Sequence, residues 1–406
     1  MAELVFKDLS FEEKYEKVRI SFLKIFYFDI DKSMLKSIGD FKISKNKIEF
    51  IDINEKRAQR KFNMLLSKGF SKLKNQLNNK LAIYVHKNSG IPLIGTTYFG
   101  LIDRGTNLIE IRPITSCNLN CIFCSVDEGL NSRKKVDFVV EKDYLVNEFK
   151  KLVDFKQEDY IDAHINAQGE PLLYANIVEL VADIAKIPQV KSISIDTNGT
   201  LLNKQLIDEL AAAGLTRINL SLHALSPEIA NKMAGTSYNL KKVMEIAAYI
   251  PKKMDLIITP VWLPGYNDNE LVKLAKFAHK IGAGKNCPAI GIQNFLNYQF
   301  GRNPVKQATM DIFYKKMQDL EQKYGVKLIC NESDFKIKKS KELPKPFKKG
   351  DVVKAKLICP GRLYKEMLAV LENRVISVPN CHKQEGFVKL KIRRTKHNIF
   401  LGELLD

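Results

Sequence analysis

The feature that most constrains the fold is the alternation of apolar β-type runs with amphipathic helix patterns between Asn107 and Tyr324. Each of the first five runs precedes a helix pattern, and one of these patterns starts at the predicted N-cap Asn203 and stops at Gly214. The six predicted strands are Leu108–Ile114, Tyr160–Ile165, Val190–Ile195, Arg217–Leu222, Asp255–Val261 and Ala289–Gln293. Such alternation predicts a parallel sheet with right-handed crossovers, either open or closed into a partial barrel. In both arrangements the chemistry lies at the C-terminal ends of the strands.

The residues before this region have a different pattern. Helical segments are predicted around Phe11–Phe26 and Glu55–Gln76, and they flank a β-like stretch near Lys42–Ile53. We therefore expect residues 1–106 to form an accessory α+β domain and residues 107–330 to form the partial barrel.

The C-terminal part begins with a charged connector, residues 331–346, which contains Pro344 and Pro346 and predicts an extended or flexible linker. Short, closely spaced β-type runs follow in residues 347–406 and predict a small antiparallel β-barrel. The fold class expected for the whole chain is α/β: a partial (β/α)6 barrel with an N-terminal α+β domain and a C-terminal β-barrel.

Charge and cysteine content limit the partners and the compartment. The 406 residues include 65 Lys and Arg against 46 Asp and Glu, a net charge of +19 that favours a polyanionic partner such as RNA. Neither a signal peptide nor an uninterrupted apolar stretch of about 18 residues is present, so we expect a cytoplasmic protein without a membrane partner. Seven cysteines, an odd number, favour metal ligation over a disulfide framework.

Three of these cysteines, Cys117, Cys121 and Cys124, crowd into the loop after the first predicted strand. Thiolates ligate iron-sulfur clusters, and a tetranuclear cluster normally has four of them. Three ligands leave one iron open for a non-protein ligand. The alternatives are a structural zinc site, for which a second closely spaced cysteine pair is missing, and a chance grouping of buried cysteines.

The three-then-two spacing, with Phe123 before the last cysteine, resembles the radical S-adenosylmethionine (SAM) superfamily. The resemblance covers Asn107 to Gln293 and implies a 4Fe-4S cluster on the three cysteines, with SAM chelating the open iron. It further implies that an electron passes into the sulfonium and creates a 5′-deoxyadenosyl radical, which abstracts hydrogen from an inert C–H bond. An electron donor such as a ferredoxin or flavodoxin is implied as a partner.

Polar turns after the second to fifth strands extend the resemblance. Each is common alone as a chain reversal, but their order after successive strands is specific. In the family such turns meet the methionine ammonium, the methionine carboxylate, the ribose and the adenine in that order. The SAM contacts implied in this chain are Phe123, Gln168, Gly169, Glu170, Pro171, Thr197, Asn198, Ser221, His223, Pro264 and Gln293.

His223 is also a candidate for catalytic proton transfer, against the alternative of a hydrogen-bonded histidine in the barrel lining. It lies in a Ser-Leu-His-Ala segment that is similar to one in radical SAM RNA adenosine methyltransferases, which also need a methyl-carrying cysteine and a partner cysteine. Three alternatives stay open for the four scattered cysteines: buried hydrophobes, the methyl-carrying cysteine and its partner, or ligands of a second cluster. These cysteines are Cys287, Cys330, Cys359 and Cys381.

The C-terminal segment resembles a TRAM domain, an RNA-gripping module of tRNA methylthiotransferases, in its opening Gly350-Asp351-Val352 and its closing Leu401-Gly402-Glu403. The implied RNA contacts are Lys389, Lys391, Arg393, Arg394 and Lys396. No cysteine precedes Cys117, so the auxiliary-cluster domain of those enzymes is absent and methylation or another C–H modification gains weight over methylthiolation.

Three functions compete on these grounds. The first is modification of RNA, most plausibly tRNA. The second directs the same radical chemistry at a protein, lipid or small molecule, with the C-terminal barrel as a docking module. The third is a non-catalytic iron-sulfur RNA-binding protein, which the complete set of SAM-pocket motifs disfavours.

Overall fold

The computed structural model describes residues 1–405, which form two compact units. The first unit consists of residues 1–85 and 135–139, and the second of residues 86–134 and the chain from 140 onward. Each unit is described by itself below.

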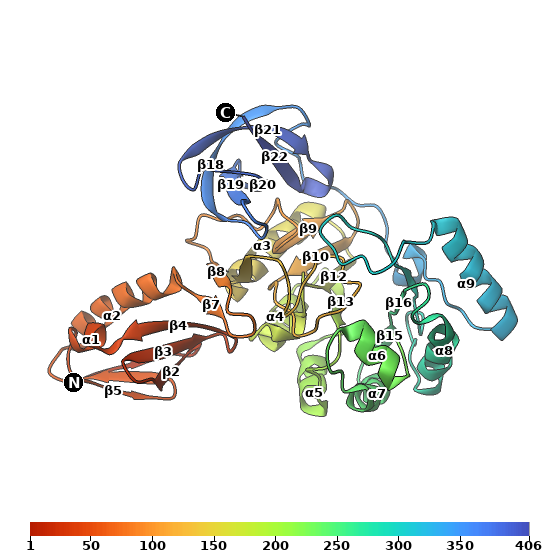
Figure 1. The fold of residues 1–406 in the computed structure, drawn as a ribbon, viewed down its shortest axis with the longest axis horizontal. Helices are drawn as coiled ribbons and strands as arrows, with labels where there is room; N and C mark the ends of the chain where they lie inside the picture. The colour runs from red at the N-terminus through yellow and green to blue at the C-terminus, as the bar shows by residue number, and fades with distance from the viewer. Residues whose placement is uncertain (406) are drawn as a thin grey trace. The chain divides into compact units, whose positions relative to one another are not determined.

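The first unit contains two antiparallel sheets and the helix α2 (Glu55–Phe70), whose N-cap Asn54 accepts a hydrogen bond from the Arg57 N–H at 2.9 Å (Figure 1). The larger sheet runs in the order β11-β8-β7-β4-β3-β2 and the smaller in the order β1-β6-β5. Its remaining elements are β1 (Ala2–Val5), β2 (Leu9–Glu13), β3 (Lys17–Phe22), β4 (Phe26–Asp31), α1 (Lys32–Lys36), β5 (Phe41–Ser44), β6 (Lys47–Phe50), β7 (Lys74–Asn75), β8 (Leu81–Val85) and β11 (Val136–Val140).

The helix predicted over Phe11–Phe26 is wrong, because this stretch forms β2, β3 and the start of β4. In β3 every second side chain is buried, Val18, Ile20 and Phe22, and this period of two defines a strand with one face on a core. The predicted helix from Glu55 and the β-like stretch near Lys42 are confirmed.

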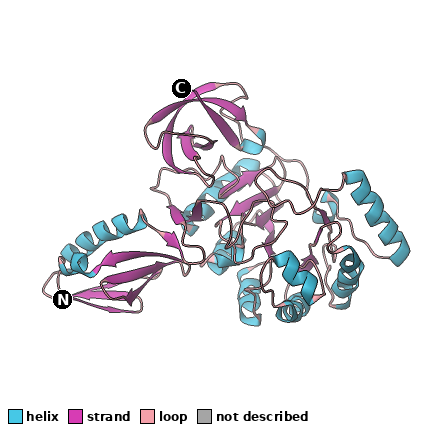
Figure 2. Ribbon diagram, viewed as in Figure 1, coloured by secondary structure: helices cyan, strands magenta, loops and turns pink. Residues whose placement is uncertain are grey.

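The second unit is built on a sheet in the order β15-β14-β13-β12-β10-β9, in which all pairs are parallel except β9 with β10 (Figures 1 and 2). Its strands are β9 (Gly100–Asp103), β10 (Leu108–Arg112), β12 (Ile161–Ile165), β13 (Val190–Thr197), β14 (Arg217–Leu220) and β15 (Asp255–Ile258). The helices are α3 (Lys142–Lys156), α4 (Ile177–Ala185), α5 (Lys204–Ala213), α6 (Pro227–Ala234), α7 (Leu240–Tyr249), α8 (Leu271–Lys280) and α9 (Met310–Tyr324). The partial barrel expected from the sequence is confirmed.

The sixth predicted strand is less regular than expected. Only Gln293–Asn294 (β17) is a strand, paired with β16 (Val261–Trp262), although Ile258 N–H donates to Ala289 O at 3.0 Å and Gly291 N–H to Ile258 O at 2.9 Å. Pro260 has no N–H to donate, so the ladder between these segments is interrupted.

The C-terminal segment closes into a barrel in the order β18-β19-β20-β22-β21, with β20 and β22 parallel and the other pairs antiparallel. The strands are β18 (Val352–Pro360), β19 (Met367–Leu371), β20 (Arg374–Val378), β21 (Phe387–Arg394) and β22 (Phe400–Leu405). Buried side chains such as Ala355, Ile376, Leu390 and Phe400 fill its interior.

This barrel is not loosely tethered to the sheet that precedes it. Val375 N–H donates to Ile94 O at 2.9 Å and Phe400 N–H to Gly95 O at 2.8 Å. Gly95 has φ +132°, and a Cβ there would lie 2.1 Å from Val375 O, so only glycine allows this approach. The connector is not a free linker: it begins with a 3-10 turn over Glu332–Phe335, and farther along the buried Lys156 Nζ donates to Lys341 O at 2.9 Å.

None of the helices within residues 1–405 combines the length and the apolar character that a membrane span requires.

Candidate active site

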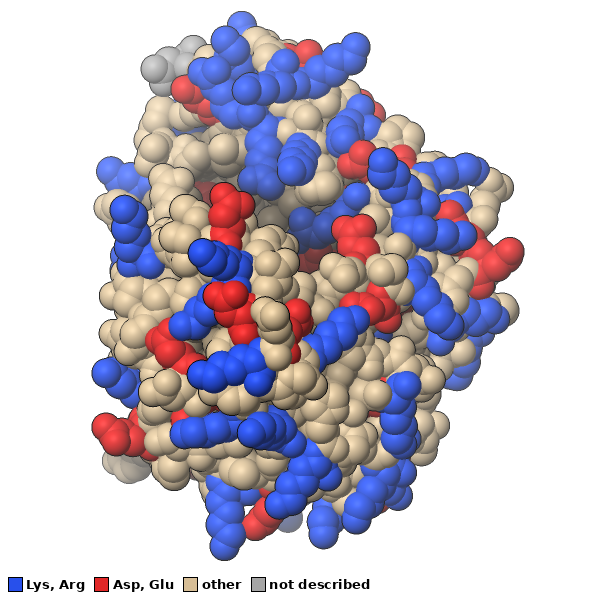
Figure 3. All heavy atoms as spheres, turned by 90° about the vertical axis from the view of Figure 1, so that its right-hand side faces the viewer, with Lys and Arg blue, Asp and Glu red and all other residues tan. Residues whose placement is uncertain are grey.

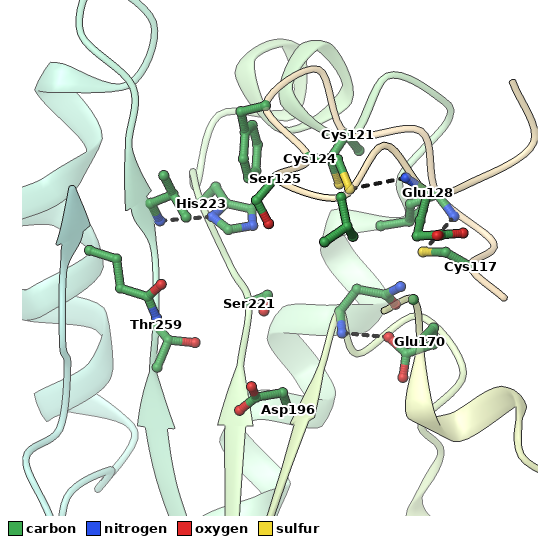
Figure 4. A pocket seen from close by; sticks show the side chains of 18 of the residues that line it. Cys117, Cys121, Cys124, Ser125, Glu128, Glu170, Asp196, Ser221, His223 and Thr259 are labelled. Atoms are coloured by element: carbon green, nitrogen blue, oxygen red, sulfur yellow. Dashed lines mark hydrogen bonds between the residues drawn. The ribbon is translucent and has the colours of Figure 1, made fainter. Parts of the chain in front are cut away.

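The three clustered cysteines line a cavity of about 350 Å³ at the C-terminal ends of the parallel strands (Figure 4). Glu170, Ser221 and His223, which follow β12 and β14, face the same cavity. The site therefore lies where the sequence predicted it, at the strand ends of a parallel sheet.

The cysteine loop is bound to the end of α6. Asn120 N–H donates to Ala234 O and Ile122 N–H to Met233 O, both at 3.0 Å. The last carbonyls of a helix lack partners within the helix, so the loop satisfies them while the helix fixes the loop. Gly235 makes the contact possible, because its φ is +62° and a Cβ would lie 2.1 Å from Asn120 O.

The turn after β12 approaches the same loop from the other side. Glu170 N–H donates to Ser116 O at 2.7 Å, and a Cβ on Gly169 would lie 2.0 Å from that oxygen. Gly169 has φ +153°, so the first residue of the Gly-Glu-Pro motif is a glycine for reasons of both space and backbone angle.

The thiols lie in surroundings suited to a bound cluster. Leu119 N–H points to Cys117 Sγ at 3.5 Å and Glu128 N–H donates to Cys124 Sγ at 3.2 Å. Burial, with a smaller contribution from Cys124, raises the pKa of Cys121 to about 12, and burial also raises the pKa of Cys117 and Cys124. A bound cluster would take these cysteines as thiolates, a form that burial alone disfavours.

Within residues 1–405, no three His, Cys, Asp or Glu side chains gather into a site for a single metal ion. A tetranuclear cluster does not need such a site, because each thiolate binds a different iron. Three thiols that share one cavity, two of them with backbone N–H donors, fit the cluster, and Cys117, Cys121 and Cys124 would be its ligands.

Glu170 is the centre of a buried brace. Its carboxylate accepts from Thr197 Oγ1 at 2.7 Å, from Asn198 N–H at 2.8 Å and from Leu172 N–H at 3.1 Å. Burial raises its pKa to about 7, although these hydrogen bonds oppose the shift. Asn198 continues the brace, since its side-chain amide donates to Asn118 Oδ1 at 3.0 Å. The strand ends of β12 and β13 are thereby joined to the cysteine loop.

His223 is neutral and held in one orientation. Its Nδ1 accepts a hydrogen bond from Val261 N–H at 3.1 Å, and its ring meets Phe123 edge-on with centroids 4.8 Å apart. Burial lowers its pKa to about 4. With Nδ1 as the acceptor, Nε2 carries the proton and can donate to a ligand in the cavity.

Most of the predicted SAM contacts come together around the cavity. The lining residues among them are Phe123, Gly169, Glu170, Thr197, Asn198, Ser221, His223 and Gln293. Three others do not line it: Gln168 donates to Thr97 Oγ1 at 3.1 Å, Pro171 starts a buried 3-10 turn, and Pro264 lies in the turn after β16.

An arginine supports the cysteine loop from the segment after β17. Arg302 Nε donates to Asp127 Oδ1 at 2.7 Å, its Nη1 donates to Cys121 O at 3.0 Å, and its N–H donates to Cys124 O at 2.9 Å. Sequence reasoning missed this contact, because Arg302 and Cys121 lie 181 residues apart and the contact has no local signal.

The C-terminal barrel also contacts this loop. Arg362, between β18 and β19, is fully buried and forms an ion pair with the buried Glu128, which lines the cavity. In the same turn Glu366 accepts from Tyr98 Oη at 2.8 Å and from Leu363 N–H at 2.9 Å. Sequence reasoning missed this ion pair, because nothing near Arg362 or Glu128 in the chain indicates the partner.

The four other cysteines do not line the main cavity. Cys330 lines a second cavity and donates to Ile290 O at 3.3 Å, while Cys381 lies in the core of the C-terminal barrel. Burial raises the pKa of Cys287 and of Cys359 to about 12, as expected for unreactive thiols.

Comparison with known proteins agrees with this geometry. The Radical SAM superfamily model matches residues 111–278. The uncharacterized protein MJ0103 of Methanocaldococcus jannaschii is 42% identical over 360 residues, which cover 82% of this chain and 83% of that protein. The chain belongs to the radical SAM superfamily.

This radical SAM enzyme is also similar to GTP 3′,8-cyclases. The identity is 30% over 183 residues with the cyclase of Aquifex aeolicus, covering 45% of this chain and 55% of that enzyme. With the cyclase of Syntrophomonas wolfei it is 33% over 183 residues, covering 44% and 53%. The chain thus spans about half the length of these cyclases.

Two solved structures show a low similarity. TYW1 with a lysine-pyruvate adduct is 18% identical, with a TM-score of 0.42, covering 57% of this chain and 78% of that chain. Streptococcus suis SuiB bound to S-adenosylmethionine is 14% identical, with a TM-score of 0.42, covering 80% and 72%.

The cofactors of this radical SAM enzyme are a 4Fe-4S cluster and S-adenosylmethionine, and it needs an electron donor. Bound together, the two cofactors supply one-electron chemistry that abstracts hydrogen from C–H bonds. The protein's share is to hold the cysteine loop on α6, to join it to the strand ends through Glu170 and Asn198, and to present the His223 N–H toward the cavity.

Proposed function

We propose that this radical SAM enzyme modifies RNA, most plausibly tRNA, by C–H functionalisation such as methylation or methylthiolation. The observation that carries the proposal is the outward face of the paired strands β18 and β21. There Lys354 lies directly opposite Lys389, and Val352 lies opposite Lys391. Like charges placed opposite each other destabilise a sheet, and a bound polyanion removes that cost.

An aromatic side chain lies beside these lysines. Phe387 is 60% exposed, and the Lys354 ammonium lies 5.3 Å from its ring centroid. A shallow groove on this face is lined by Lys354, Lys383, Phe387 and Lys389. Cations for phosphates beside a ring on which a base can stack are the usual elements of a single-stranded RNA site.

The predicted RNA contacts differ in charge environment. Lys389 and Arg394 are exposed and Lys396 is exposed in the turn after β21, whereas Arg393 forms an ion pair with Glu403. Figure 3 shows Lys and Arg spread over one face of the molecule and gathered at the top of the view, where the C-terminal barrel lies. Lys354, Lys383 and Phe387 extend the predicted set of RNA contacts.

We also propose that the enzyme works in the cytoplasm.

Charge reversal on the barrel tests the proposal. Lys354→Glu/Lys389→Glu should weaken binding of a fluorescent tRNA at least tenfold and reduce the slope of log affinity against log salt by about 1.5, because two phosphate contacts are lost. The matched control Lys241→Glu/Lys315→Glu changes the net charge equally at exposed sites on α7 and α9. Equal effects of the two double variants would reject the barrel as an RNA site.

A second candidate substrate is a free purine nucleotide, which the similarity to GTP 3′,8-cyclases favours. Mass spectrometry separates the two. Nucleosides of tRNA and rRNA from cells with and without the gene should differ by one modified nucleoside if RNA is the substrate. An unchanged nucleoside profile, with turnover of a nucleotide by the purified enzyme, would favour the second candidate.

A further inference from the structure

A second cavity, of about 280 Å³, lies inside the partial barrel. It shares Asp196, Thr259 and Gln293 with the cysteine-lined cavity, so the two are adjacent. Figure 4 shows Asp196, which lies on β13, below Ser221, which follows β14, on the side away from the cysteines. A ligand here would lie next to the SAM pocket without occupying it.

Asp196 has hydrogen-bonding capacity left toward this cavity. Its Oδ1 accepts from Asn219 Nδ2 at 2.8 Å, and its Oδ2 lies 3.2 Å from His164 Nε2. The side chain remains 45% exposed although it lies within the barrel. A carboxylate offers about four acceptor positions, so each oxygen has one more to offer.

The surrounding groups decide which ligand suits these positions. His164 Nδ1 is bonded to Ser194 Oγ at 2.9 Å, which fixes the ring with Nε2 toward Asp196. When His164 is protonated, the pair carries no net charge, so the site favours neutral N–H donors over a cation. Among the described residues that line this cavity none is Lys or Arg, so it is not built for phosphate.

We propose that this cavity binds a guanine base, with the Asp196 carboxylate accepting from its N1–H and N2–H groups. This inference rests on the proposed function, because it takes the substrate to be RNA or a nucleotide. Guanine presents two neighbouring N–H donors on its Watson–Crick edge, whereas adenine presents an acceptor at N1, which a carboxylate repels. Enzymes that act on a base in RNA extrude it into such a pocket and read this edge.

Binding measurements on the anaerobic holoenzyme with SAM test the proposal, with GMP and AMP as probes. Wild type should bind GMP at least tenfold more tightly than AMP. Asp196→Asn should lose at least tenfold in GMP affinity, because the amide places a donor against the base, and should leave AMP and SAM affinity within twofold. The control Asp154→Asn, the same substitution at an exposed site on α3 outside the cavity, should bind GMP like wild type.

Several results would overturn the proposal: equal affinity of the wild type for GMP and AMP, tighter binding of a lysine amide than of GMP, or a parallel loss of SAM affinity in Asp196→Asn. Iron content and thermal unfolding show whether the variant is folded. The wild-type comparison of GMP with AMP does not depend on any variant.

Two RNA oligonucleotides that differ only by one G or A separate this inference from the RNA function. If the oligonucleotide with G binds more tightly and Lys354→Glu/Lys389→Glu weakens both, the base belongs to RNA and both proposals hold. If GMP preference persists while that double variant leaves RNA binding unchanged, the guanine site holds and the RNA function fails. If RNA binding follows the barrel but G and A are equivalent, only the guanine site fails.

Discussion

In the cysteine loop, the backbone N–H groups of Asn120 and Ile122 are bonded to the end of α6, and the carbonyls of Cys121 and Cys124 accept from Arg302. In the barrel interior beside it, Asp196 meets two donors and keeps half of its acceptor positions open. The loop is thus held on two sides, by the end of α6 and by Arg302, as suits a permanently held cofactor. The interior keeps unsatisfied acceptors, as suits a ligand that enters and leaves.

Loss of a ligand thiol should have the largest effect on this contrast. Alanine at Cys117, Cys121 or Cys124 should abolish iron binding and reductive SAM cleavage, because no other cysteine lines the cavity within the described residues. Iron content and 5′-deoxyadenosine formation after anaerobic reconstitution measure both. Cys381→Ala, in the core of the C-terminal barrel, is the control. Full cleavage by a triple alanine variant would contradict the assignment.

Breaking the buried ion pair behind the loop should have the next largest effect. Arg362→Met leaves the Glu128 carboxylate buried without its partner guanidinium, which costs about 3 to 5 kcal/mol in unfolding free energy. Glu128→Gln/Arg362→Met removes both charges and should recover much of this loss. Denaturant unfolding and the rate of iron release to a chelator give the measurement. Additive effects of the two single changes would show that the pair is not coupled.

The Glu170 brace should show a smaller effect, on SAM rather than on the cluster. Glu170→Gln replaces one acceptor oxygen by an NH2 group that faces the Thr197 hydroxyl or the Asn198 N–H, both of which are donors. The loss of a charge-assisted hydrogen bond costs about 1.5 to 3 kcal/mol in free energy. SAM affinity should fall at least tenfold while iron content stays near that of wild type. Unchanged affinity would mean that this turn only shapes the chain.

The smallest effect, on stability alone, is expected from Glu110, inside the barrel. Burial opposes ionisation, yet Arg112 and Arg104 lower the pKa of Glu110 to about 2 from 4.5. Its contribution to stability is therefore present above pH 4.5 and is lost as the pH falls toward 2. The difference in unfolding free energy between wild type and Glu110→Gln should shrink over that interval, as acid titrations of unfolding would show. A difference independent of pH would contradict this.

The fold could be predicted where the pattern is local. Five of the six barrel strands and the C-terminal β-barrel lie where apolar periodicity indicated them. The helix predicted over Phe11–Phe26 failed, because the aromatic and β-branched residues of that stretch favour strands and are buried with a period of two. The irregular sixth strand depends on where a proline meets its neighbour in the sheet, which only the register decides.

For the site, the sequence by itself determined the chemistry that depends on short spacing: three thiols within eight residues and the Gly-Glu-Pro turn. The tertiary structure alone decided what lies around them. In it the Glu170 carboxylate is already hydrogen-bonded to the next strand end, whereas Asp196 keeps acceptor positions toward the barrel interior. It also pairs Arg362 with Glu128, 234 residues away in the chain. Local motifs record which atoms can react, but burial and long-range contacts fix which of those atoms are already satisfied, and these arise only when distant segments meet.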